Sequence, residues 1–313
     1  MNTPPEQSPA PLVSVIIPVY NRAGTIQRAV ASVLTQSYRP IEVIVVDDGS
    51  TDSTVKQLES YGNRIRLIRQ KNSGPGKARN VGIRAATGEI ISFLDSDDAW
   101  LPEKLEHQVR LLERTSAHGV HCCVCNARMI AADGSEKTSF AIAGLSPEAS
   151  QGVWTNPGEV LLTRFLFFNQ TVAVKRGLLN QVGLFNENFR LLEDYDLALR
   201  LALTGPWAYI AEPLVIWHGG VDNSLSRGAT EPEVILRTDE ILAELQSSPR
   251  WSARLPSGLV RRRRKLLQRH LRVQNFCQRA PVWLGRCARF YLRVQKWLYY
   301  HQPLCPRMDA YGV

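Results

Sequence analysis

The sequence lacks the regularly spaced cysteines of a small disulfide-rich secreted protein. Its 313 residues include six cysteines, of which Cys122, Cys123 and Cys125 lie together and the other three are scattered near the C-terminus. No second CxxC pair accompanies the cluster, and we expect strand alternation to turn Cys123 away from the other two. These features favour buried thiols over a zinc site, in a chain suited to the reducing cytoplasm.

Long uncharged apolar runs are also missing. Because a spanning helix needs about 18 or more such residues, we predict none in this chain. Residues 1–11 are rich in proline and polar side chains, do not resemble a signal peptide, and are expected to be a disordered lead. The composition, 44% hydrophobic and 21% charged, excludes an intrinsically disordered chain and is that of a globular domain with room for an appendage.

Acidic residues are nearly absent from the C-terminal part of the chain. Residues 251–313 hold 14 lysines and arginines but one acid, Asp309, whereas the first 250 residues hold 24 basic and 28 acidic side chains. The formal net charge of +9 therefore divides into −4 for the body and +13 for the tail. Such an asymmetry predicts two parts with different roles.

Apolar segments of strand length alternate with helical periodicity in the first hundred residues. Strands are predicted at 13–21, 41–46, 65–69 and 90–94, and helices at 25–36, from about 53, and at 76–86. These strands are almost continuous in apolar residues, which is typical of a parallel sheet covered on both faces. The second half is less regular, with strands expected at 120–130 and 208–218, a strand or another buried segment at 165–175, and a helix at 193–202. The fold class is therefore α/β.

Three carboxylates, Asp95, Asp97 and Asp98, follow the fourth predicted strand within four positions. They would repel one another unless a cation lay between them, and Mg²⁺ and Mn²⁺ prefer oxygen ligands, including substrate phosphates. In the alternative interpretation, Asp98 caps the helix that follows Leu101-Pro102-Glu103. Polar residues also follow the first and second strands, and ligands of parallel sheets bind beyond the carboxyl ends of the strands. This convergence favours a cation–phosphate site.

Five short motifs follow one another along the chain. They are Val13-Ser14-Val15-Ile16-Ile17-Pro18-Val19-Tyr20-Asn21, Glu42-Val43-Ile44-Val45-Val46-Asp47-Asp48-Gly49-Ser50-Thr51-Asp52, Ala78-Arg79-Asn80-Val81-Gly82, Asp95-Ser96-Asp97-Asp98 and Glu193-Asp194. In this order they resemble the family-2 inverting glycosyltransferases of GT-A fold, over roughly residues 12–225. The resemblance implies a Rossmann-like, mostly parallel central sheet flanked by helices, to which a basic helical extension is added at the C-terminus.

The resemblance also implies a nucleotide-sugar site. Pro18, Tyr20 and Asp47 or Asp48 would line the uridine pocket, and Arg79 would face the base or the phosphates. A carboxylate is suited to accept the uracil imide hydrogen, while the tyrosine ring can lie beside the base. The alternative for the two aspartates is a turn and helix cap, and for Arg79 an exposed arginine on a helix.

A divalent cation, Mn²⁺ or Mg²⁺, is implied in the same way. Asp97 would be its direct ligand, with Asp95 directed toward the ribose or a metal-bound water, and the cation would stabilise the departing nucleoside diphosphate. His218 follows a late strand, where some members of the family place a histidine near the metal or diphosphate. A lone histidine is also common as a structural or exposed residue.

Asp194 matches the catalytic base of the family. An inverting transfer needs a carboxylate to take the proton of the acceptor hydroxyl as that oxygen attacks the anomeric carbon. Glu193 would orient Asp194 or contact the acceptor. Acidic residues at the start of a helix are also favoured by the helix dipole, which is the alternative explanation for the pair.

The tail has the pattern of an interfacial helix. Over residues 259–300, aromatic and basic side chains occupy neighbouring helical faces, as expected for contact with an anionic membrane surface. The alternatives are a helix packed on the preceding domain and a nucleic-acid-binding segment, the latter disfavoured because no recognition motif accompanies it.

We therefore predict a disordered lead at 1–11, a GT-A catalytic domain at 12–240 and a basic amphipathic helical tail at 241–313. The expected function is transfer of a sugar, most readily from a UDP-sugar, to a glycan or lipid-linked acceptor. The expected location is the cytoplasm, with peripheral contact at the inner face of the cell membrane. The alternatives are a non-catalytic nucleotide- or sugar-binding protein and a nucleotidyltransferase, although the loop after the first strand does not suit the latter.

Overall fold

The computed structural model of the chain describes residues 9–130, 134–164, 166, 168–218 and 230–279. Residues 1–8 of the lead predicted at 1–11 and the tail beyond residue 279 lie outside the described residues, as does the aromatic part of the expected interfacial helix. No helix among those described is long and apolar enough to cross a membrane.

The first four strands form the parallel half of the sheet. They are β1 (Val13–Val19), β2 (Ile41–Asp47), β3 (Arg66–Arg69) and β4 (Ile90–Phe93). β1 pairs in parallel with both β2 and β4, and β2 with β3. The helices between them are α1 (Ile26–Leu34), α2 (Thr54–Glu59) and α3 (Pro75–Ala85). The alternation read from the sequence is confirmed here, because continuous apolar strands bury both of their faces.

The second half of the chain extends the same sheet with mixed pairing. Its strands are β5 (Ala99–Trp100), β6 (Cys122–Ile130), β7 (Glu136–Thr138), β8 (Gln151–Trp154), β9 (Val172–Lys175) and β10 (Trp207–His218). Within the described residues, the order is β3-β2-β1-β4-β9-β6-β10-β5, while β7 pairs with β6 and β8 with β10. β9 is antiparallel to both β4 and β6, whereas β10 is parallel to β6.

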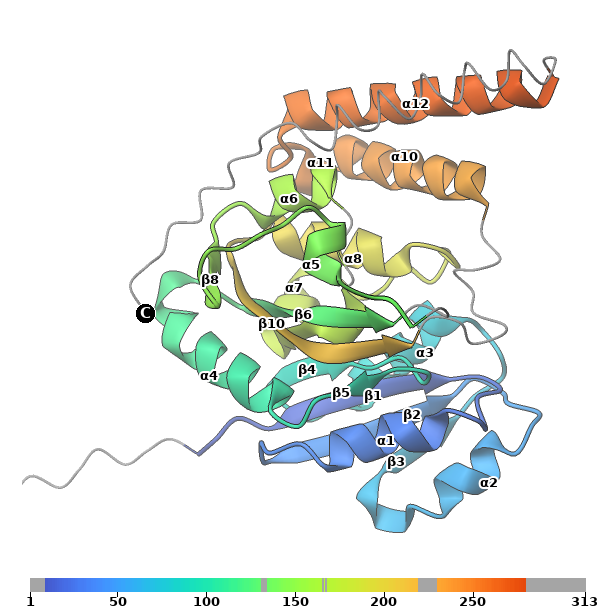
Figure 1. The fold of residues 1–313 in the computed structure, drawn as a ribbon, viewed down its shortest axis with the longest axis vertical. Coiled ribbons are helices and arrows are strands. Elements are labelled where there is room, and N and C mark those ends of the chain that lie inside the picture. The colour runs from blue at the N-terminus through green and yellow to red at the C-terminus, as the bar shows by residue number, and fades with distance from the viewer. Residues whose placement is uncertain (1–8, 131–133, 165, 167, 219–229, 280–313) are drawn as a thin grey trace, which may run out of the picture.

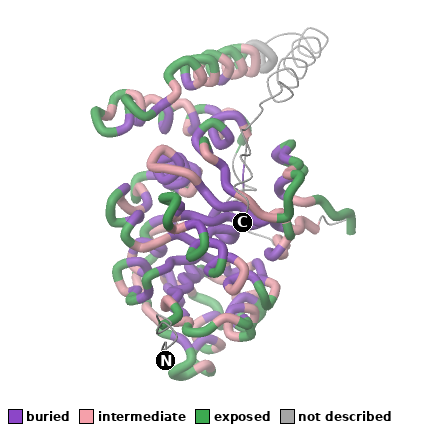
Figure 2. Tube along the Cα trace, turned by 90° about the vertical axis from the view of Figure 1, so that its left-hand side faces the viewer, coloured by how far each residue is buried: buried purple, intermediate pink, exposed green. Residues whose placement is uncertain are grey.

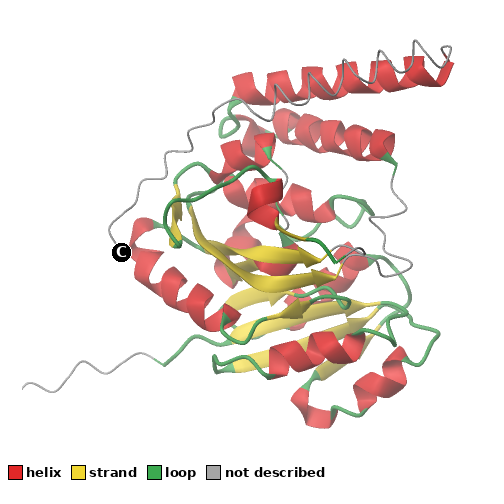
Figure 3. Cartoon of the chain, viewed as in Figure 1, coloured by secondary structure: helices red, strands yellow, loops and turns green. Residues whose placement is uncertain are grey.

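Helices cover both faces of the sheet (Figures 1 and 3). Side chains of α1, α2 and α4 (Lys104–Thr115) pack on one face. The other face is covered by α3 and by four further helices. These are α5 (Ser139–Ile142), α6 (Pro157–Thr163), α7 (Arg176–Val182) and α8 (Glu193–Ala202). Figure 2 shows that the buried residues gather at the centre of the fold.

A helical pair follows β10. It consists of α10 (Glu231–Ser247) and α12 (Ser257–Arg279), joined by α11 (Pro249–Ser252), and it lies beyond α6 and α8 (Figure 1). Val260 and Leu267 of α12 are buried in the same apolar core as the sheet. Position 240, expected as the boundary of the catalytic domain, lies within α10, so the helix continues from the predicted domain into the predicted tail.

The structure corrects or narrows three local interpretations of the sequence. Asp98 does not cap the next helix, because β5 intervenes and Glu103 occupies the N-cap position. Cys122 faces one apolar core, whereas Cys123 and Cys125 both face the other, as residues two apart in a strand must. The segment at 165–175, expected to be a strand or another buried segment, is a strand only over β9, which is preceded by a turn of 3-10 helix at Asn169–Thr171.

Candidate active site

A cavity of about 660 Å³ opens at the carboxyl ends of β1, β2 and β4 and at the N-terminus of α8. Eight of the predicted site residues line it: Pro18, Tyr20, Asp48, Arg79, Asp95, Asp97, Glu193 and Asp194. Asp47 and His218 are not among the lining residues. The topology explains the convergence, since carboxyl ends of parallel strands meet at one edge of the sheet.

The loops after β1 and β2 are tied together beside this cavity. Asn21 adopts a left-handed conformation, with φ of 50°, and its backbone N–H donates to Ser50 Oγ at 2.9 Å. Its side-chain oxygen accepts from the backbone N–H of Thr51 at 2.8 Å. Tyr20 is 45% exposed at the cavity, so its ring is available to a ligand.

The two aspartates after β2 have separate roles. Asp48 accepts from the backbone N–H groups of Ser73 and Gly74, both at 2.8 Å, and from the Gln70 amide at 2.7 Å. It therefore fixes the loop that leads into α3. Asp47 accepts from the Ser50 backbone N–H at 3.2 Å within the turn. Neither caps α2; Asp52 accepts from the first backbone N–H of that helix.

Asp95 and Asp97 project from the loop after β4. Their side chains are 30% and 21% exposed. Arg22 Nε lies 3.6 Å from an Asp97 carboxylate oxygen, and Arg79 Nη2 lies 2.7 Å from Asp95 Oδ1. Burial and the charge of Asp95 raise the pKa of Asp97. Two repelling carboxylates at the edge of a cavity form an arrangement that a cation would stabilise.

Asp98 is the buried member of the carboxylate cluster. Its oxygens accept from the backbone N–H of His218 at 3.0 Å and from the Gln170 amide at 3.2 Å. Burial, followed by the charges of Asp95 and Asp97, raises its pKa well above the usual value. Asp98 thus joins the end of β10 to the loop after β4. This contact uses the backbone of His218, and the residue that reaches the cavity from this strand end is Trp217.

Arg79 connects the two groups of acids. Its guanidinium donates to Asp95 and, through Nη1, to Glu193 at 2.8 Å, and it is 4% exposed. The alternative of an exposed helix arginine is therefore wrong. α3 can carry this side chain into the site because Gly82 lets the helix approach β1 closely: a Cβ there would lie 2.4 Å from Ile16.

Glu193 and Asp194 begin α8 beneath the cavity. Leu192 precedes them with a left-handed φ of 62°, which directs the chain into the helix. Burial raises the pKa of both carboxyl groups, while the charge of Arg79 lowers both. The pKa of Glu193 rises to about 7, and the charge of Asp194 contributes to that rise. The Glu193 carboxylate is paired with Arg79. The Asp194 carboxylate accepts a hydrogen bond within its own helix, from the Tyr195 backbone N–H at 2.8 Å.

The loop that enters α8 is fixed by Arg200. This buried guanidinium pairs with Asp196 at 2.6 Å and donates to the carbonyl oxygens of Val182, Gly183 and Leu184. Sequence reasoning did not select Arg200, Arg22, Asn169 or Arg190, although the last three line the cavity. Arg22 was detectable as part of the loop after the first strand; the others carried no motif.

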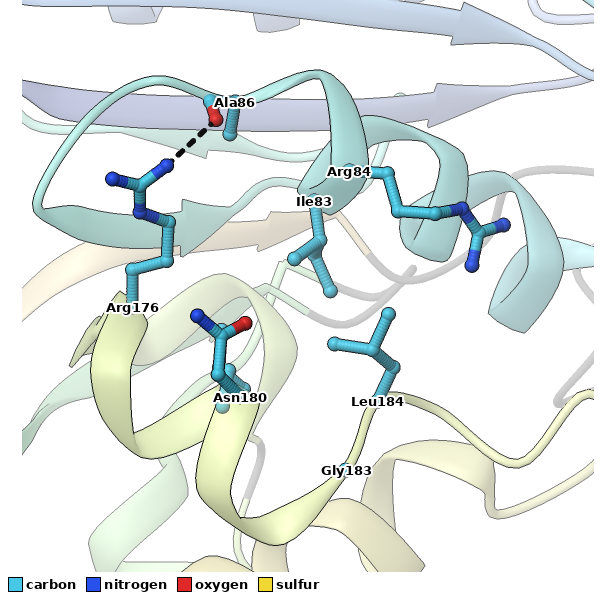
Figure 4. Close-up of a pocket in the computed structure, with 8 residues that line it drawn as sticks. Ile83, Arg84, Ala86, Arg176, Asn180, Gly183 and Leu184 are labelled. Atoms are coloured by element: carbon cyan, nitrogen blue, oxygen red, sulfur yellow. Dashed lines mark hydrogen bonds between the residues drawn. The ribbon is translucent and has the colours of Figure 1, made fainter.

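A smaller hollow of about 320 Å³ lies between α3 and α7 (Figure 4). Figure 4 shows the Arg176 side chain reaching from α7 to the carbonyl oxygen of Ala86, a hydrogen bond of 3.0 Å. None of the predicted site residues lines this hollow. The larger cavity is therefore the candidate active site.

Comparison with known proteins gives the family. Residues 14–177 match the family described as glycosyl transferase family 2. An uncharacterized glycosyltransferase of Rickettsia typhi is 35% identical over 189 residues, which cover 60% of this chain and 58% of that protein. The succinoglycan biosynthesis protein ExoO of Rhizobium meliloti is 33% identical over 280 residues, covering 87% of this chain and 76% of that protein. The chain spans 58% of the length of the first two Rickettsia relatives.

Solved structures of S. aureus TarS share the fold. The structure of TarS 1–349 in complex with UDP-GlcNAc has a TM-score of 0.63 at 22% identity, covering 84% of this chain and 72% of that one. The complex with UDP has a TM-score of 0.60 at 22% identity, covering 84% and 71%. This likeness confirms the expected GT-A fold. Since the family match spans more than half of the sequence, the chain belongs to glycosyl transferase family 2.

Proposed function

We propose that this protein transfers a sugar from a nucleotide-sugar donor, a UDP-sugar, to a saccharide or lipid-linked saccharide with inversion at the anomeric carbon. The observation that carries the proposal is that one cavity is lined both by Asp95 and Asp97 and by Asp194. A single displacement needs those two functions in one place: stabilisation of a leaving diphosphate and a base for the incoming hydroxyl. The UDP-GlcNAc complex of TarS supports the donor class, and the name of ExoO supports a polysaccharide product.

Asp194 is the proposed base. As the acceptor oxygen forms its bond to the anomeric carbon, the bond from that carbon to the diphosphate breaks, and the hydroxyl proton passes to the Asp194 carboxylate. No covalent enzyme intermediate is required. A raised pKa suits this role, because it brings the proton affinity of the carboxylate closer to neutrality. Glu193 is the proposed positioning residue, since its carboxylate is held by Arg79.

Asp95 and Asp97 fit a divalent cation, Mn²⁺ or Mg²⁺. Both are partly exposed oxygen donors on one loop, and diphosphate oxygens would complete the ligand set. The described residues contain no group of three or more His, Cys, Asp or Glu side chains that could hold a metal ion by themselves. When bound, the cation would neutralise charge on the leaving diphosphate. The metal role of His218 remains a prediction, since the structure places only its backbone in the Asp98 contact.

The remaining donor contacts follow from the cavity. We assign Pro18, Tyr20 and Asp48 to the nucleoside, with Asp47 supporting the turn behind them. Arg79 is bonded to Asp95 and Glu193, and we assign it to positioning those acids at the diphosphate end.

The first test of the function is UDP binding to the full chain. We expect UDP to raise the melting temperature when Mn²⁺ is present and to do so only weakly without it, because the phosphates and carboxylates repel one another unless a cation separates them. Calorimetry with other nucleoside diphosphates gives the base preference. Equal responses to UDP with and without Mn²⁺ or Mg²⁺ would remove the cation from the proposal.

We also propose that the basic helix contacts an anionic membrane surface, where a lipid-linked acceptor would lie. The described part of the tail supports this with a row of exposed cations along α12: Arg261, Arg262, Lys265, Arg269 and Arg272. The opposite side of α12 packs on α10 through Val260, Leu267 and the Arg264–Asp239 ion pair, 2.7 Å long. Truncation before α12 would expose this apolar surface, so substitution is the better test.

Replacing four exposed cations of α12 with glutamine should weaken binding to vesicles of phosphatidylglycerol and phosphatidylcholine at least tenfold, since each contributes about 1 kcal/mol near an anionic surface. The positions are Arg261, Arg262, Lys265 and Arg269. A matched control replaces four exposed cations of the main body: Lys56, Arg64, Arg114 and Lys137. Flotation assays measure both. If both variants lose the same amount of vesicle binding, the effect comes from net charge alone, and the proposal of a membrane-facing helix is refuted.

A further inference from the structure

Two polar residues of the cavity, Asn169 and Arg190, take no part in the proposed donor site or base. Asn169 lines the cavity and is 3% exposed, and its side-chain oxygen has no hydrogen-bond partner among the described residues. A buried amide without a partner is unfavourable, and native proteins usually pair such groups with protein, water or ligand. This oxygen has almost no solvent-accessible surface, so a ligand hydroxyl in the cavity would satisfy it once the side-chain amide turns the oxygen toward the cavity.

Arg190 is the second of these residues. It is exposed, lines the cavity, and lies four positions before Asp194. The other two arginines of the cavity are held by acids, Arg22 by Asp97 and Arg79 by Asp95 and Glu193. Among the described residues, no acidic side chain lies within ion-pair distance of Arg190, so a positive charge is presented to whatever enters.

The segment that carries Arg190 is well anchored. Phe189 is buried, and the Arg237 guanidinium lies 4.7 Å from the centre of its ring. Upstream, Asn80 exchanges hydrogen bonds with the backbone of Phe185 at 2.9 and 3.0 Å. The backbone beneath Arg190 is thereby fixed relative to the base, as a substrate-recognising residue requires.

We propose that the acceptor is an anionic saccharide, whose phosphate or carboxylate group binds Arg190 and one of whose hydroxyls donates to Asn169. Guanidinium groups bind these anions through paired, charge-assisted hydrogen bonds. The donor diphosphate is assigned to the Asp95–Asp97 end of the cavity, whereas Arg190 belongs to the segment that leads into Asp194, where the acceptor hydroxyl must arrive. The inference rests on the proposed function, because it names the acceptor of that site.

The test compares three sugars that share one ring but differ in charge: glucose, glucuronate and glucose 6-phosphate. Calorimetric titrations use the full chain, with and without UDP and Mn²⁺. We expect the two anionic sugars to bind the wild-type protein at least tenfold more tightly than glucose. Arg190→Gln should abolish this preference, and Arg190→Lys should retain part of it. Arg254→Gln, which removes an exposed arginine outside the cavity lining, should leave it intact.

Asn169 is tested separately. Asn169→Leu and Asn169→Ala should weaken binding of all three sugars about tenfold. The leucine variant should melt no lower than the wild type, because it replaces an unpaired polar group by an apolar one of similar size. A lower melting temperature with unchanged sugar binding would make Asn169 structural and refute its part.

Two results overturn the role of Arg190. The wild-type protein could bind the three sugars equally, or Arg190→Gln could lose UDP affinity while keeping the charge preference, in which case the donor diphosphate is its ligand. A third result, that the wild-type protein does not bind UDP at all, bears on another proposal. It contradicts the proposed function, while the titrations without UDP still report on Arg190.

Discussion

Asp194→Asn should lower the turnover number by roughly 10²–10⁴, which is the usual contribution of a general base. The amide cannot take the acceptor proton, but it preserves the shape of the side chain and leaves the Asp95–Asp97 end of the cavity unchanged. UDP affinity in the presence of Mn²⁺ should therefore stay within about twofold of the wild-type value. Steady-state transfer rates and calorimetric UDP binding, measured on the same preparations, check the two halves of the prediction.

The pH dependence adds a second readout for the base. Burial raises the pKa of Asp194, so the basic form is lost as the pH falls through a value higher than that of a free aspartate. Wild-type turnover should decline along this acid limb, and the residual turnover of the asparagine variant should lack it. The variant should be at least as stable as the wild type near neutral pH, where the buried carboxylate is penalised by desolvation.

Glu240→Gln is the control, since it removes an exposed acid of α10 outside the cavity lining. It should keep both turnover and UDP affinity. Wild-type turnover in Asp194→Asn would exclude Asp194 as the base and direct attention to Glu193, whose pKa is raised to about 7.

Asp97→Ala should remove the part of UDP affinity that depends on the cation. In the wild-type protein we expect Mn²⁺ to strengthen UDP binding by at least about tenfold, since each 1.4 kcal/mol of cation-mediated attraction corresponds to that factor. Without the Asp97 carboxylate, titrations with and without Mn²⁺ should give nearly the same affinity. Turnover should fall strongly as well, because the leaving diphosphate is no longer stabilised.

Two variants separate the metal role from general damage to the loop. Asp97→Asn keeps the size of the side chain but removes its charge, and it should behave like the alanine variant. Asp52→Asn alters another loop acid, one that caps α2 away from the cavity lining, and it should retain the full response to Mn²⁺. An undiminished response in both Asp97 variants would refute Asp97 as the cation ligand.

The alternation of strands and helices in the N-terminal part was predictable because it depends on local sequence patterns. Val13–Val19 and Ile41–Asp47 are continuous apolar runs, and such runs followed by amphipathic helices dictate a parallel sheet with polar loops at one edge. The same reasoning predicts that the polar clusters Tyr20-Asn21, Asp47-Asp48 and Asp95–Asp98 meet at that edge.

Predictions failed or stopped short where the outcome depends on distant segments. For Asp98 the sequence left a cation site and a helix cap as alternatives, whereas in the structure it is buried and accepts hydrogen bonds from β10 and Gln170, more than 70 residues away. The division at residue 240 cut through α10, whose capping residues Thr230 and Glu233 define a helix that runs across that position. The antiparallel insertion of β9 between β4 and β6 had no local signal at all.

By itself, the sequence determined the α/β class, the carboxylate-lined edge and the acidic pair at 193–194. The reason is that the pattern of a strand and the polar residues at its end are set by neighbouring residues in the chain. Only the tertiary structure decided which polar groups are already satisfied and which face the cavity. It showed that Arg79 is held by acids from two distant segments. Among the described residues, the side-chain oxygen of Asn169 has no hydrogen-bond partner, and Arg190 lines the same cavity without an acidic partner. Pairing between remote side chains depends on how the segments pack, and no pattern of neighbouring residues specifies it.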